Sequence, residues 1–321
     1  MNPVIDRGIV YPYNFGLMEA VQIRDVTKTF GALAAVDDLT LTVPEGSVYG
    51  FIGPNGSGKT TTMRMIVNIL YPDRGSIRVF GREMSGARSE WIGYLPEERG
   101  VYRRMPVRTL LEFYGELRSG RNVSAEVTAW LDKFDLARCA SQKVETLSKG
   151  MSQKVQFIAA VVPQPKLLIL DEPFTGLDPV SMDLVRESIL ELRRRGATII
   201  LSTHDMHVAE SMCDYIFMIF RGRKVLDGTL TAVQDRYAAD TIRVTVDGGA
   251  AALAGIAGVE KVRDLGQVQE IRLAAGADPQ QILRALVARS RVTSFAVTRP
   301  SLHDIFVRIA GPAAEEAAQV A

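Results

Sequence analysis

The sequence predicts an α/β protein, with a doubly wound core of parallel strands and helices followed by a small α+β domain. Three observations support this fold class. Apolar strand patterns alternate with helical patterns over the first two thirds of the chain, a glycine-rich loop joins one such strand to a helix, and the order of elements changes after Thr229. The length of 321 residues fits about two domains of ordinary size.

The strands and helices of the core can be placed from their apolar spacing. β-branched and alternating stretches predict strands, whereas uninterrupted apolar runs predict buried parallel strands. Apolar residues three and four positions apart predict helices. The predicted strands are Val21–Phe30, Leu39–Val43, Val48–Ile52, Leu167–Leu170 and Ala197–Ser202, and the predicted helices are Thr60–Leu70 and Ser181–Arg195, with a mostly helical block from Arg103 to Val162.

The remaining C-terminal stretch predicts a βαββαβ order, which is that of a small split-βαβ domain. The predicted elements are a strand at Thr241–Val246, a short helix at Ala250–Ile256, strands at Val259–Asp264 and Val268–Leu273, a helix at Pro279–Arg289, a strand at Val292–Thr298 and a closing helix at Ser301–Ile309. The Ala- and Glu-rich residues 312–321 are expected to form a flexible tail.

Composition and charge exclude several classes of protein. Lys plus Arg is 38 and Asp plus Glu is 37, so the net charge of +1 disfavours a protein that coats nucleic acid or an anionic membrane. The two cysteines, Cys139 and Cys213, are too far apart in sequence to predict a zinc cluster or a disulfide framework. No apolar stretch is long enough for a transmembrane helix, and residues 1–17 do not resemble a signal peptide. We expect residues 1–17 to be a disordered extension, or translation to start at Met18.

The glycine-rich loop Gly53-Pro-Asn-Gly-Ser-Gly-Lys-Thr60 lies between a predicted strand and a predicted helix. It fits the pattern G-x-x-x-x-G-K-[ST], in which glycines let successive backbone N–H groups face one concavity that can hold phosphate oxygens. We expect Lys59 to reach the β- and γ-phosphates of a nucleotide and the Thr60 hydroxyl to bind Mg²⁺. An ordinary glycine turn is the alternative, and the strand and helix on either side favour the nucleotide.

Two acidic residues follow the predicted strand Leu167–Leu170. Asp171 ends the strand and can deliver a carboxylate to a magnesium ion, while Glu172 can activate a water molecule as a general base. A simple exit from strand to loop would explain such a pair if it stood alone. The glycine-rich loop elsewhere in the chain makes the catalytic interpretation the better one.

Two further motifs could face phosphate. Ser148 and Gly150, in Leu147-Ser-Lys-Gly-Met151, precede a helical stretch and would form a second anion-binding end, although a plain helix cap explains the same pattern. His204 follows the predicted strand Ala197–Ser202. A histidine there is often structural, but its place beside a phosphate site favours contact with the γ-phosphate.

These motifs, in this order, resemble those of the ATP-binding subunits of ABC transporters, and the resemblance covers about Met18 to Thr229. Gly53–Thr60 corresponds to the Walker A loop, Leu167–Glu172 to Walker B, and Leu147–Met151 to the signature usually written LSGGQ. Gly176-Leu-Asp178 corresponds to the D-loop, His204 to the switch histidine, and Phe30 to the aromatic ring that stacks on adenine.

The resemblance implies a P-loop NTPase core of ABC ATPase type with an inserted helical subdomain, and it implies a set of site residues. Catalysis would depend on Glu172, His204 and Lys59, with Thr60, Glu97 and Asp171 holding Mg²⁺, and with Ser148, Gly150 and the D-loop Asp178 acting on the nucleotide of a partner subunit. ATP would be bound by Phe30, Gly53, Pro54, Asn55, Gly56, Ser57, Gly58, Lys59, Thr60 and Thr61.

The domain boundaries follow from the same resemblance. The ATP-binding domain would span 18–229, with its helical subdomain at about 98–162. Residues 230–311 resemble the accessory domain found on some ATP-binding subunits of the export-type, ABC-2 branch. That second resemblance rests on the order of elements and on no motif.

Two positions depart from the family pattern. Glu97 stands where the family usually has the glutamine of its Q-loop, which would make the site depend more on the metal because a carboxylate binds Mg²⁺ more strongly than an amide. Lys149 replaces the first signature glycine and Met151 the glutamine. Lys149 would either add positive charge near the partner's γ-phosphate or be a solvated side chain, which is the simpler interpretation.

The resemblance also implies partners and a location. ATP would lie between the loop of one subunit and Ser148 of a second copy, or of a homologous subunit, in a head-to-tail dimer. A separate membrane permease would bind the helical block after Glu97, including Arg103, Arg104 and Met105, so the chain would lie on the cytoplasmic, inner face of the cell membrane. For the two arginines a solvated surface is an equal alternative.

Two other functions stay open. A non-transport ABC ATPase acting on a soluble macromolecule is the first, although ribosome-acting relatives generally carry two ATPase halves and DNA-repair relatives carry long insertions that this chain lacks. The second is a ligand-sensing role for the C-terminal domain, for which the sequence indicates no site. The sequence does not indicate the transported substrate.

Overall fold

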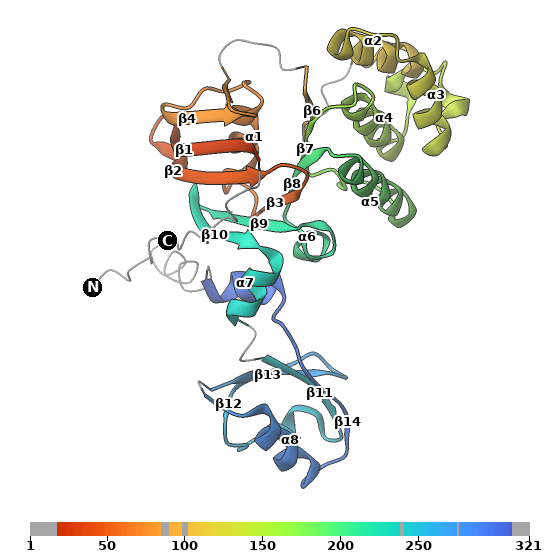
Figure 1. The fold of residues 1–321 in the computed structure, drawn as a ribbon. Coiled ribbons are helices and arrows are strands. Elements are labelled where there is room, and N and C mark those ends of the chain that lie inside the picture. Colours follow the sequence, from red (N-terminus) through yellow and green to blue (C-terminus); the bar gives the residue numbers. More distant parts are fainter. Residues whose placement is uncertain (1–17, 85–89, 98–101, 238–240, 275, 310–321) are drawn as a thin grey trace. The chain divides into compact units, whose positions relative to one another are not determined.

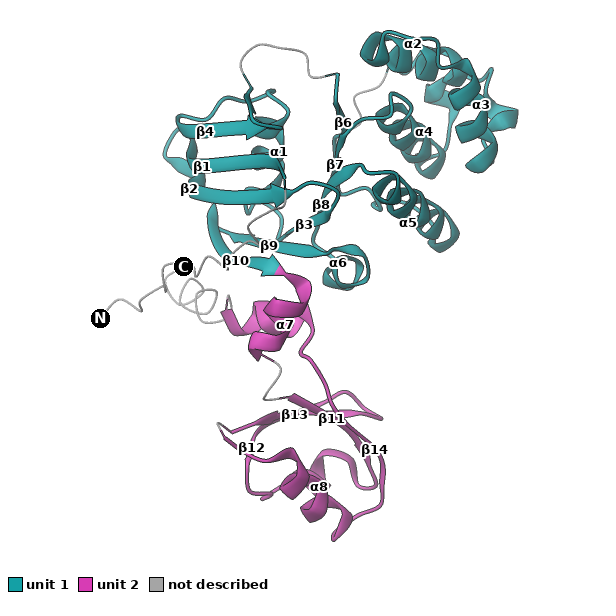
Figure 2. Ribbon diagram, in the orientation of Figure 1, with its two compact units in different colours: residues 1–228 teal, residues 229–321 magenta. Residues whose placement is uncertain are grey.

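The computed structural model describes residues 18–84, 90–97, 102–237, 241–274 and 276–309 (Figure 1). The expected N-terminal extension and the C-terminal tail lie outside these residues. The chain divides into two compact units, residues 1–228 and 229–321 (Figure 2). In the described part of the chain, no helix is long and apolar enough to cross a membrane.

The first unit is built on a six-stranded sheet with the strand order β10-β9-β3-β8-β7-β6. Its central strands β3, β7 and β8 are buried throughout, and the pairs β3–β8, β7–β8, β6–β7 and β3–β9 are parallel. Continuous apolar runs suit such strands because both faces of the sheet are covered. The bounds are β3 Val48–Ile52, β6 Ile92–Leu95, β7 Leu167–Asp171, β8 Thr198–Thr203, β9 Tyr215–Phe220 and β10 Arg223–Thr229.

A second sheet, antiparallel, stands beside the first in the same unit (Figure 1). Its strand order is β2-β1-β4-β5, with β1 at Glu19–Phe30, β2 at Leu33–Pro44, β4 at Arg74–Val79 and β5 at Arg82–Glu83. Apolar side chains of β1, β2 and β4 form one buried cluster with Tyr49 and Phe51 of β3. This cluster fixes β3, and therefore the loop that follows it, from both sheets.

Helices surround the parallel sheet, and three of them form the block predicted from Arg103 to Val162. They are α2 Val107–Ser119, α3 Ser124–Lys133 and α4 Lys149–Val161, with two short 3-10 helices between α3 and α4. The rings of Trp130, Phe134 and Phe157 pack together between α3 and α4. The other helices of the unit are α1 Lys59–Ile66, α5 Pro179–Arg194 and α6 Met206–Met212. The prediction of a helix as far as Leu70 is wrong, because Asn68 takes a left-handed conformation with φ of 62° beyond the end of α1.

The second unit begins with α7 (Leu230–Tyr237) and contains an antiparallel sheet with the order β12-β13-β11-β14. This is the order expected of a split-βαβ domain, with α8 (Pro279–Val287) packed on one face of the sheet. The strands are β11 Thr241–Val246, β12 Val259–Asp264, β13 Gln269–Leu273 and β14 Val292–Val297, and residues 302–309 form a closing helix.

One element of this unit differs from the prediction. The segment expected to be a helix at Ala250–Ile256 is a 3-10 helix of five residues, Gly249–Leu253. Gly248 and Gly249, at its start, both have positive φ, which suits a tight turn rather than a regular helix. The short crossover still buries Leu253 and Ile256 in the core of the domain.

Candidate functional site

The glycine-rich loop connects β3 to α1 and leaves no room for larger residues at two positions. A Cβ atom at Gly53 would lie 2.3 Å from the carbonyl oxygen of Ile219, and one at Gly58 would lie 2.5 Å from that of Ala35. Gly58 also has a φ of 113° and precedes α1 without any side-chain cap, so the first N–H groups of the helix face the loop. The loop therefore forms a cradle of backbone donors suited to phosphate oxygens.

Lys59, the first residue of α1, is buried inside this cradle. Its Nζ atom donates hydrogen bonds to the carbonyl oxygens of Gly53, at 2.7 Å, and Pro54, at 3.1 Å. Burial lowers the pKa of Lys59, and the nearby carboxylates of Glu172, Asp171 and Glu97 oppose that effect. The structure thus brings the loop lysine near three of the four acidic residues singled out from the sequence, and the fourth, Asp178, lies at the start of α5.

One hydroxyl group, that of Ser202, contacts both acidic residues at the end of β7, Asp171 through its carboxylate and Glu172 through its backbone. Ser202, on the neighbouring strand β8, donates its hydroxyl to Asp171 Oδ1 and accepts a hydrogen bond from the backbone N–H of Glu172 at 3.0 Å. Glu172 itself has a φ of 50°, a conformation that non-glycine residues rarely adopt. The parallel pairing of β7 and β8 creates this arrangement, because Asp171 lies opposite Ser202 in the register.

His204 contacts the second carboxylate. Its Nδ1 atom lies 2.9 Å from Glu172 Oε1, and the histidine side chain is 59% exposed whereas that of Glu172 is 9% exposed. A largely buried carboxylate that contacts an accessible imidazole is suited to orienting a water molecule and to exchanging protons with it. The structure therefore places Glu172 and His204 as a pair at the ends of adjacent strands.

The donor set is suited to a magnesium ion. Asp171 is fully buried, and its Oδ2 atom has no hydrogen-bond partner among the described residues. A buried carboxylate oxygen without a partner is costly unless a cation or water satisfies it. Carboxylate and hydroxyl oxygens such as those of Asp171 and Thr60 are the ligands that Mg²⁺ prefers in proteins.

The remaining predicted residues lie at the edge of this arrangement. Phe30 ends β1 with 49% of its surface exposed, and Lys28 Nζ lies 5.6 Å from the centre of its ring. Glu97 follows β6 and is exposed, close enough to act electrostatically on Lys59. In the loop, Asn55 and Gly56 are exposed, Pro54 is half-buried and Ser57 is buried, while Thr61 is half-buried in the first turn of α1.

The signature residues and the D-loop residues of one chain lie close together in space. Ser148 caps α4 by accepting a hydrogen bond from Met151 N at 3.2 Å, and Asp178 caps α5 by accepting one from Ser181 N at 2.9 Å. The aliphatic chain of Lys149 lies against Gly176, since a Cβ atom there would be 2.8 Å from Lys149 Cε. Both motifs are thus helix N-termini that lie side by side.

Ser202 is the functional residue that sequence reasoning missed. The sequence predicts only a buried strand at this position, although Ser202 stands two residues before His204 in Ser202-Thr-His-Asp. A hydroxyl at the end of a strand that neighbours the acidic strand was the available signal. Its partner could not be identified without the order of strands in the sheet.

Comparison with known proteins agrees with this site. Residues 36–175 match the family described as ABC transporter, and residues 228–310 match the C-terminal domain of DrrA1-3-like ATP-binding proteins. The chain is 38% identical over 291 residues to the ABC transporter ATP-binding protein YhaQ of Bacillus subtilis. The alignment covers 90% of this chain and 98% of the relative. It is 33% identical over 300 residues to the Nod factor export ATP-binding protein I of Rhizobium sp. strain N33, covering 91% and 97% of the two chains.

Solved structures show the same fold for the first unit. An ATP-binding subunit of an ABC transporter superposes with a TM-score of 0.64 and 30% identity, covering 68% of this chain and 93% of that one. A nucleotide-free ATP-binding cassette superposes with a TM-score of 0.59, covering 66% and 92%. The predicted α/β fold of P-loop NTPase type is therefore confirmed. With its ATP-binding cassette and its DrrA-like C-terminal domain, the chain belongs to the ATP-binding, ATP-hydrolysing subunits of ABC transporters.

Proposed function

We propose that this ATPase subunit drives export through a separate membrane permease. The observation that carries the chemical part is the joint placement of Lys59, Asp171, Glu172 and His204 around one glycine loop. The direction of transport is supported by two relatives, one named for Nod factor export and one, LnrL of Bacillus subtilis, for linearmycin resistance. The second is 31% identical to this chain over 310 residues.

In the proposed reaction the chain holds the phosphates and positions a water molecule. The backbone donors between Gly53 and Thr60 and the Lys59 ammonium bind the β- and γ-phosphates, which is where charge must be stabilised during phosphoryl transfer. Asp171, Thr60 and Glu97 would hold Mg²⁺, which when bound would neutralise phosphate charge. Phe30 stacks on the adenine base.

Glu172 and His204 would act on the attacking water. The Glu172 carboxylate accepts the proton of the water as it attacks the γ-phosphorus, and His204 holds that carboxylate through the 2.9 Å contact while its exposed edge faces the γ-phosphate. The His204 side chain is exposed and that of Glu172 is largely buried, so His204 would be the one of the two that can move when phosphate leaves the site.

The site is proposed to be completed by a second copy of the chain or by a homologous subunit. Ser148, Gly150 and Asp178 would face the nucleotide held by the partner's glycine loop. Their place at two adjacent helix N-termini supports this role, since such ends attract anions. Hydrolysis would then be coupled to the closing and opening of the dimer.

An exposed aromatic surface on the helical block is the proposed docking surface for the permease. Tyr102, Phe113 and Leu117 are 58%, 39% and 50% exposed, and the rings of Tyr102 and Phe113 contact each other edge to face. Exposed aromatic side chains of this kind are enriched at interfaces. Binding there would keep the subunit on the inner face of the membrane.

Co-purification with any membrane protein that is encoded beside this chain tests the transporter assignment. The tagged wild-type chain is expected to recover that protein from detergent-solubilised membranes, and Phe113→Ser with Leu117→Ser is expected to reduce recovery several-fold while ATP binding is unchanged. Val287→Ser, an exposed apolar substitution in the other unit, is the control. Recovery of ribosomes or of a soluble complex, with no membrane protein, would support the non-transport alternative instead.

A further inference from the structure

Tyr94 lies on β6, the strand next to the one that carries Asp171. In the parallel pairing of β6 with β7, Tyr94 is opposite Ile169. Asp171 follows two residues later on β7 and therefore faces the same side of the sheet. The tyrosine packs there against the buried cluster that contains Ile169 and Met63 of α1. By strand geometry the Cα atoms of Tyr94 and Asp171 are about 8 Å apart, which is within the reach of a tyrosine side chain.

Two buried oxygen atoms on this side of the sheet have no hydrogen-bond partner among the described residues. They are the hydroxyl oxygen of Tyr94 and Oδ2 of Asp171. Buried polar atoms of this kind are costly unless a partner satisfies them. A phenolic hydroxyl can donate a hydrogen and a carboxylate oxygen can only accept one, so the two groups are complementary.

The pKa of Tyr94 agrees with a hydroxyl that lies near these carboxylates. Burial raises this pKa to about 12, and the negative charges of Asp171 and Glu97 add to the rise, while a contact with Arg64 of α1 opposes it. A guanidinium can only donate, so Arg64 leaves the hydroxyl hydrogen without an acceptor. That hydrogen is therefore available to a carboxylate.

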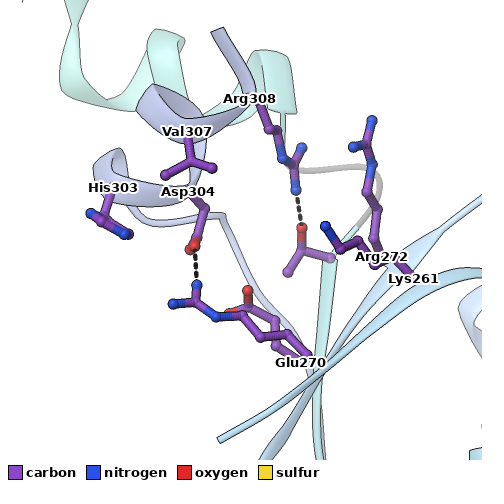
Figure 3. Close-up of a pocket in the computed structure, with 9 residues that line it drawn as sticks. Lys261, Glu270, Arg272, His303, Asp304, Val307 and Arg308 are labelled. Atoms are coloured by element: carbon purple, nitrogen blue, oxygen red, sulfur yellow. Dashed lines mark hydrogen bonds and ion pairs between the residues drawn. The ribbon is translucent and has the colours of Figure 1, made fainter. Parts of the chain in front are cut away.

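The carboxylate of Asp304 in the second unit shows how a fully partnered group differs from Asp171. Asp304 lines a cavity between the sheet of that unit and the helix of residues 302–309 (Figure 3). Its Oδ1 atom accepts from Arg263 Nη1 at 2.9 Å, and its Oδ2 atom accepts from the backbone N–H of Ser301 at 3.3 Å. Asp171 is more deeply buried but has a partner on Oδ1 alone, so its second oxygen can take a further donor.

We propose that Tyr94 is a positioning residue for the proposed magnesium site, on which this inference rests. Its hydroxyl donates to Asp171 Oδ2 once nucleotide and Mg²⁺ are bound, as Ser202 donates to Oδ1 in the structure. Hydrogen bonds at reactive sites are often long or misaligned without ligands and tighten in the loaded complex. A carboxylate oxygen accepts at more than one position, so Oδ2 can meet both the hydroxyl and the metal.

Nucleotide binding with and without metal tests this role on the full chain. Titration calorimetry gives the Kd of a non-hydrolysable ATP analogue in EDTA and in saturating Mg²⁺, and the ratio of the first Kd to the second reports what the metal contributes. Tyr94→Phe removes only the hydroxyl and should lower this ratio about tenfold, because groups that orient metal ligands contribute about 10- to 100-fold to metal affinity. The Kd in EDTA should not change, whereas a purely structural role would weaken binding equally in both conditions.

Tyr215→Phe is the matched control, because Tyr215 is also half-buried against the same apolar cluster. Its ratio is expected to equal that of the wild-type chain. In an Asp171→Ala background the acceptor is gone, so adding Tyr94→Phe should lower the ratio no further.

Three results would each overturn the role of Tyr94. They are an unchanged ratio in Tyr94→Phe, an equal fall in the Tyr215→Phe control, and a further fall when Tyr94→Phe is added to Asp171→Ala. Equal Kd values with and without Mg²⁺ in the wild-type chain would overturn the magnesium site itself, and this inference with it. The readout is nucleotide binding alone, so it is separate from the test of the transporter function.

Discussion

Ser202 shows how one side chain can set the geometry of two others. Its hydroxyl donates to Asp171 and accepts from the backbone N–H of Glu172, in a fully buried position. The bond to the Glu172 N–H helps to hold that residue in its left-handed conformation, which costs free energy that the neighbours must supply, and Asp171 Oδ2 stays without a partner among the described residues. The metal-binding and water-activating groups of the proposed mechanism are therefore positioned together.

Glu172→Gln is expected to leave ATP binding intact while turnover falls by about 10²- to 10⁴-fold, because an amide cannot accept the proton of the attacking water. Slow hydrolysis should also trap an ATP-bound dimer. Steady-state phosphate release and size-exclusion chromatography with ATP measure the two effects. Glu187→Gln, an exposed carboxylate on α5, serves as control. Hydrolysis at the wild-type rate would remove Glu172 from the role of general base.

Glu97→Gln tests whether the exposed carboxylate beside Lys59 makes hydrolysis depend more strongly on the metal. An amide binds Mg²⁺ less tightly than a carboxylate, so the Mg²⁺ concentration needed for half-maximal ATPase activity should rise several-fold in the variant. The activity at saturating Mg²⁺ should change less. An unchanged Mg²⁺ titration would show that Glu97 takes no part in holding the metal.

At the scale of elements, β1 and the segment before β4 are fastened together by one carboxylate. Asp73 accepts hydrogen bonds from the backbone N–H and the hydroxyl of Thr29, both at 2.7 Å, and pairs with Lys28 Nζ at 2.7 Å. These hydrogen bonds, that from Lys28 first, lower the pKa of Asp73 from the ordinary 3.8 to about 2. Since β1 ends at Phe30, this carboxylate also sets the position of the ring proposed to meet adenine.

Asp73→Asn should therefore lower the Tm in a pH-dependent way. A depressed pKa means that the folded state favours the ionised carboxylate, so this stabilisation is present above pH about 4 and is lost as the pH falls through about 2. Thermal unfolding of the wild-type chain and the variant should differ at pH 7 and converge toward pH 2. A difference in Tm that stays constant over this range would contradict the role of ionisation.

Elements whose signal is local were predictable from the sequence. The strands β3, β7 and β8 consist mainly of apolar residues, and the loop between β3 and α1 has a fixed glycine spacing. The structure has these strands and the loop at the positions that the sequence predicts. β4 (Arg74–Val79) was missed, because a strand that starts with Arg-Gly-Ser has little apolar content, and its pairing with β1 crosses about fifty residues of chain.

The same reasoning applies to the site. The side chains of Lys59, Asp171 and Glu172 were identified because each lies in a recognisable local motif, and their proximity followed from the carboxyl ends of parallel strands. The role of Ser202 and the contact between Lys149 and Gly176 depend on register and on packing between helices, which no local motif records.

At the scale of the whole molecule, the proposed dimer would use one chain for two halves of different sites. The glycine loop and the carboxylates of Asp171 and Glu172 would form one half, and the N-termini of α4 and α5 would form the other. Homologous cassettes include a dimeric structure of a post-hydrolysis state, bound to ADP and phosphate, whose fold this chain shares with a TM-score of 0.59. The proposed dimer makes a prediction that no single-chain mechanism makes.

Two variants that are each inactive should complement each other when mixed. Lys59→Ala disables the loop and Ser148→Arg disables the signature, but a mixed dimer keeps one site with both halves intact. Random pairing gives half mixed dimers with one working site of two, so the mixture should recover about a quarter of wild-type ATPase activity if the sites act independently. As a control, Ser188→Ala, which changes a buried serine within α5, takes the place of Ser148→Arg in the mixture. A mixture with no recovered activity would argue against sites shared between subunits.

The position of Lys59 also has a consequence for which ligands the loop admits. Its ammonium already donates to two carbonyl oxygens of its own loop, so an arriving anion must compete for a donor that is engaged. The binding free energy is then the difference between the hydrogen bonds of Lys59 to the ligand and those to the carbonyl oxygens of Gly53 and Pro54. A ligand with a single negative charge gains little when it replaces these carbonyl groups. A nucleotide with several phosphates offers the ammonium more than the carbonyls do. The contacts of Lys59 with Gly53 and Pro54 would therefore favour polyphosphates over simple anions of single charge.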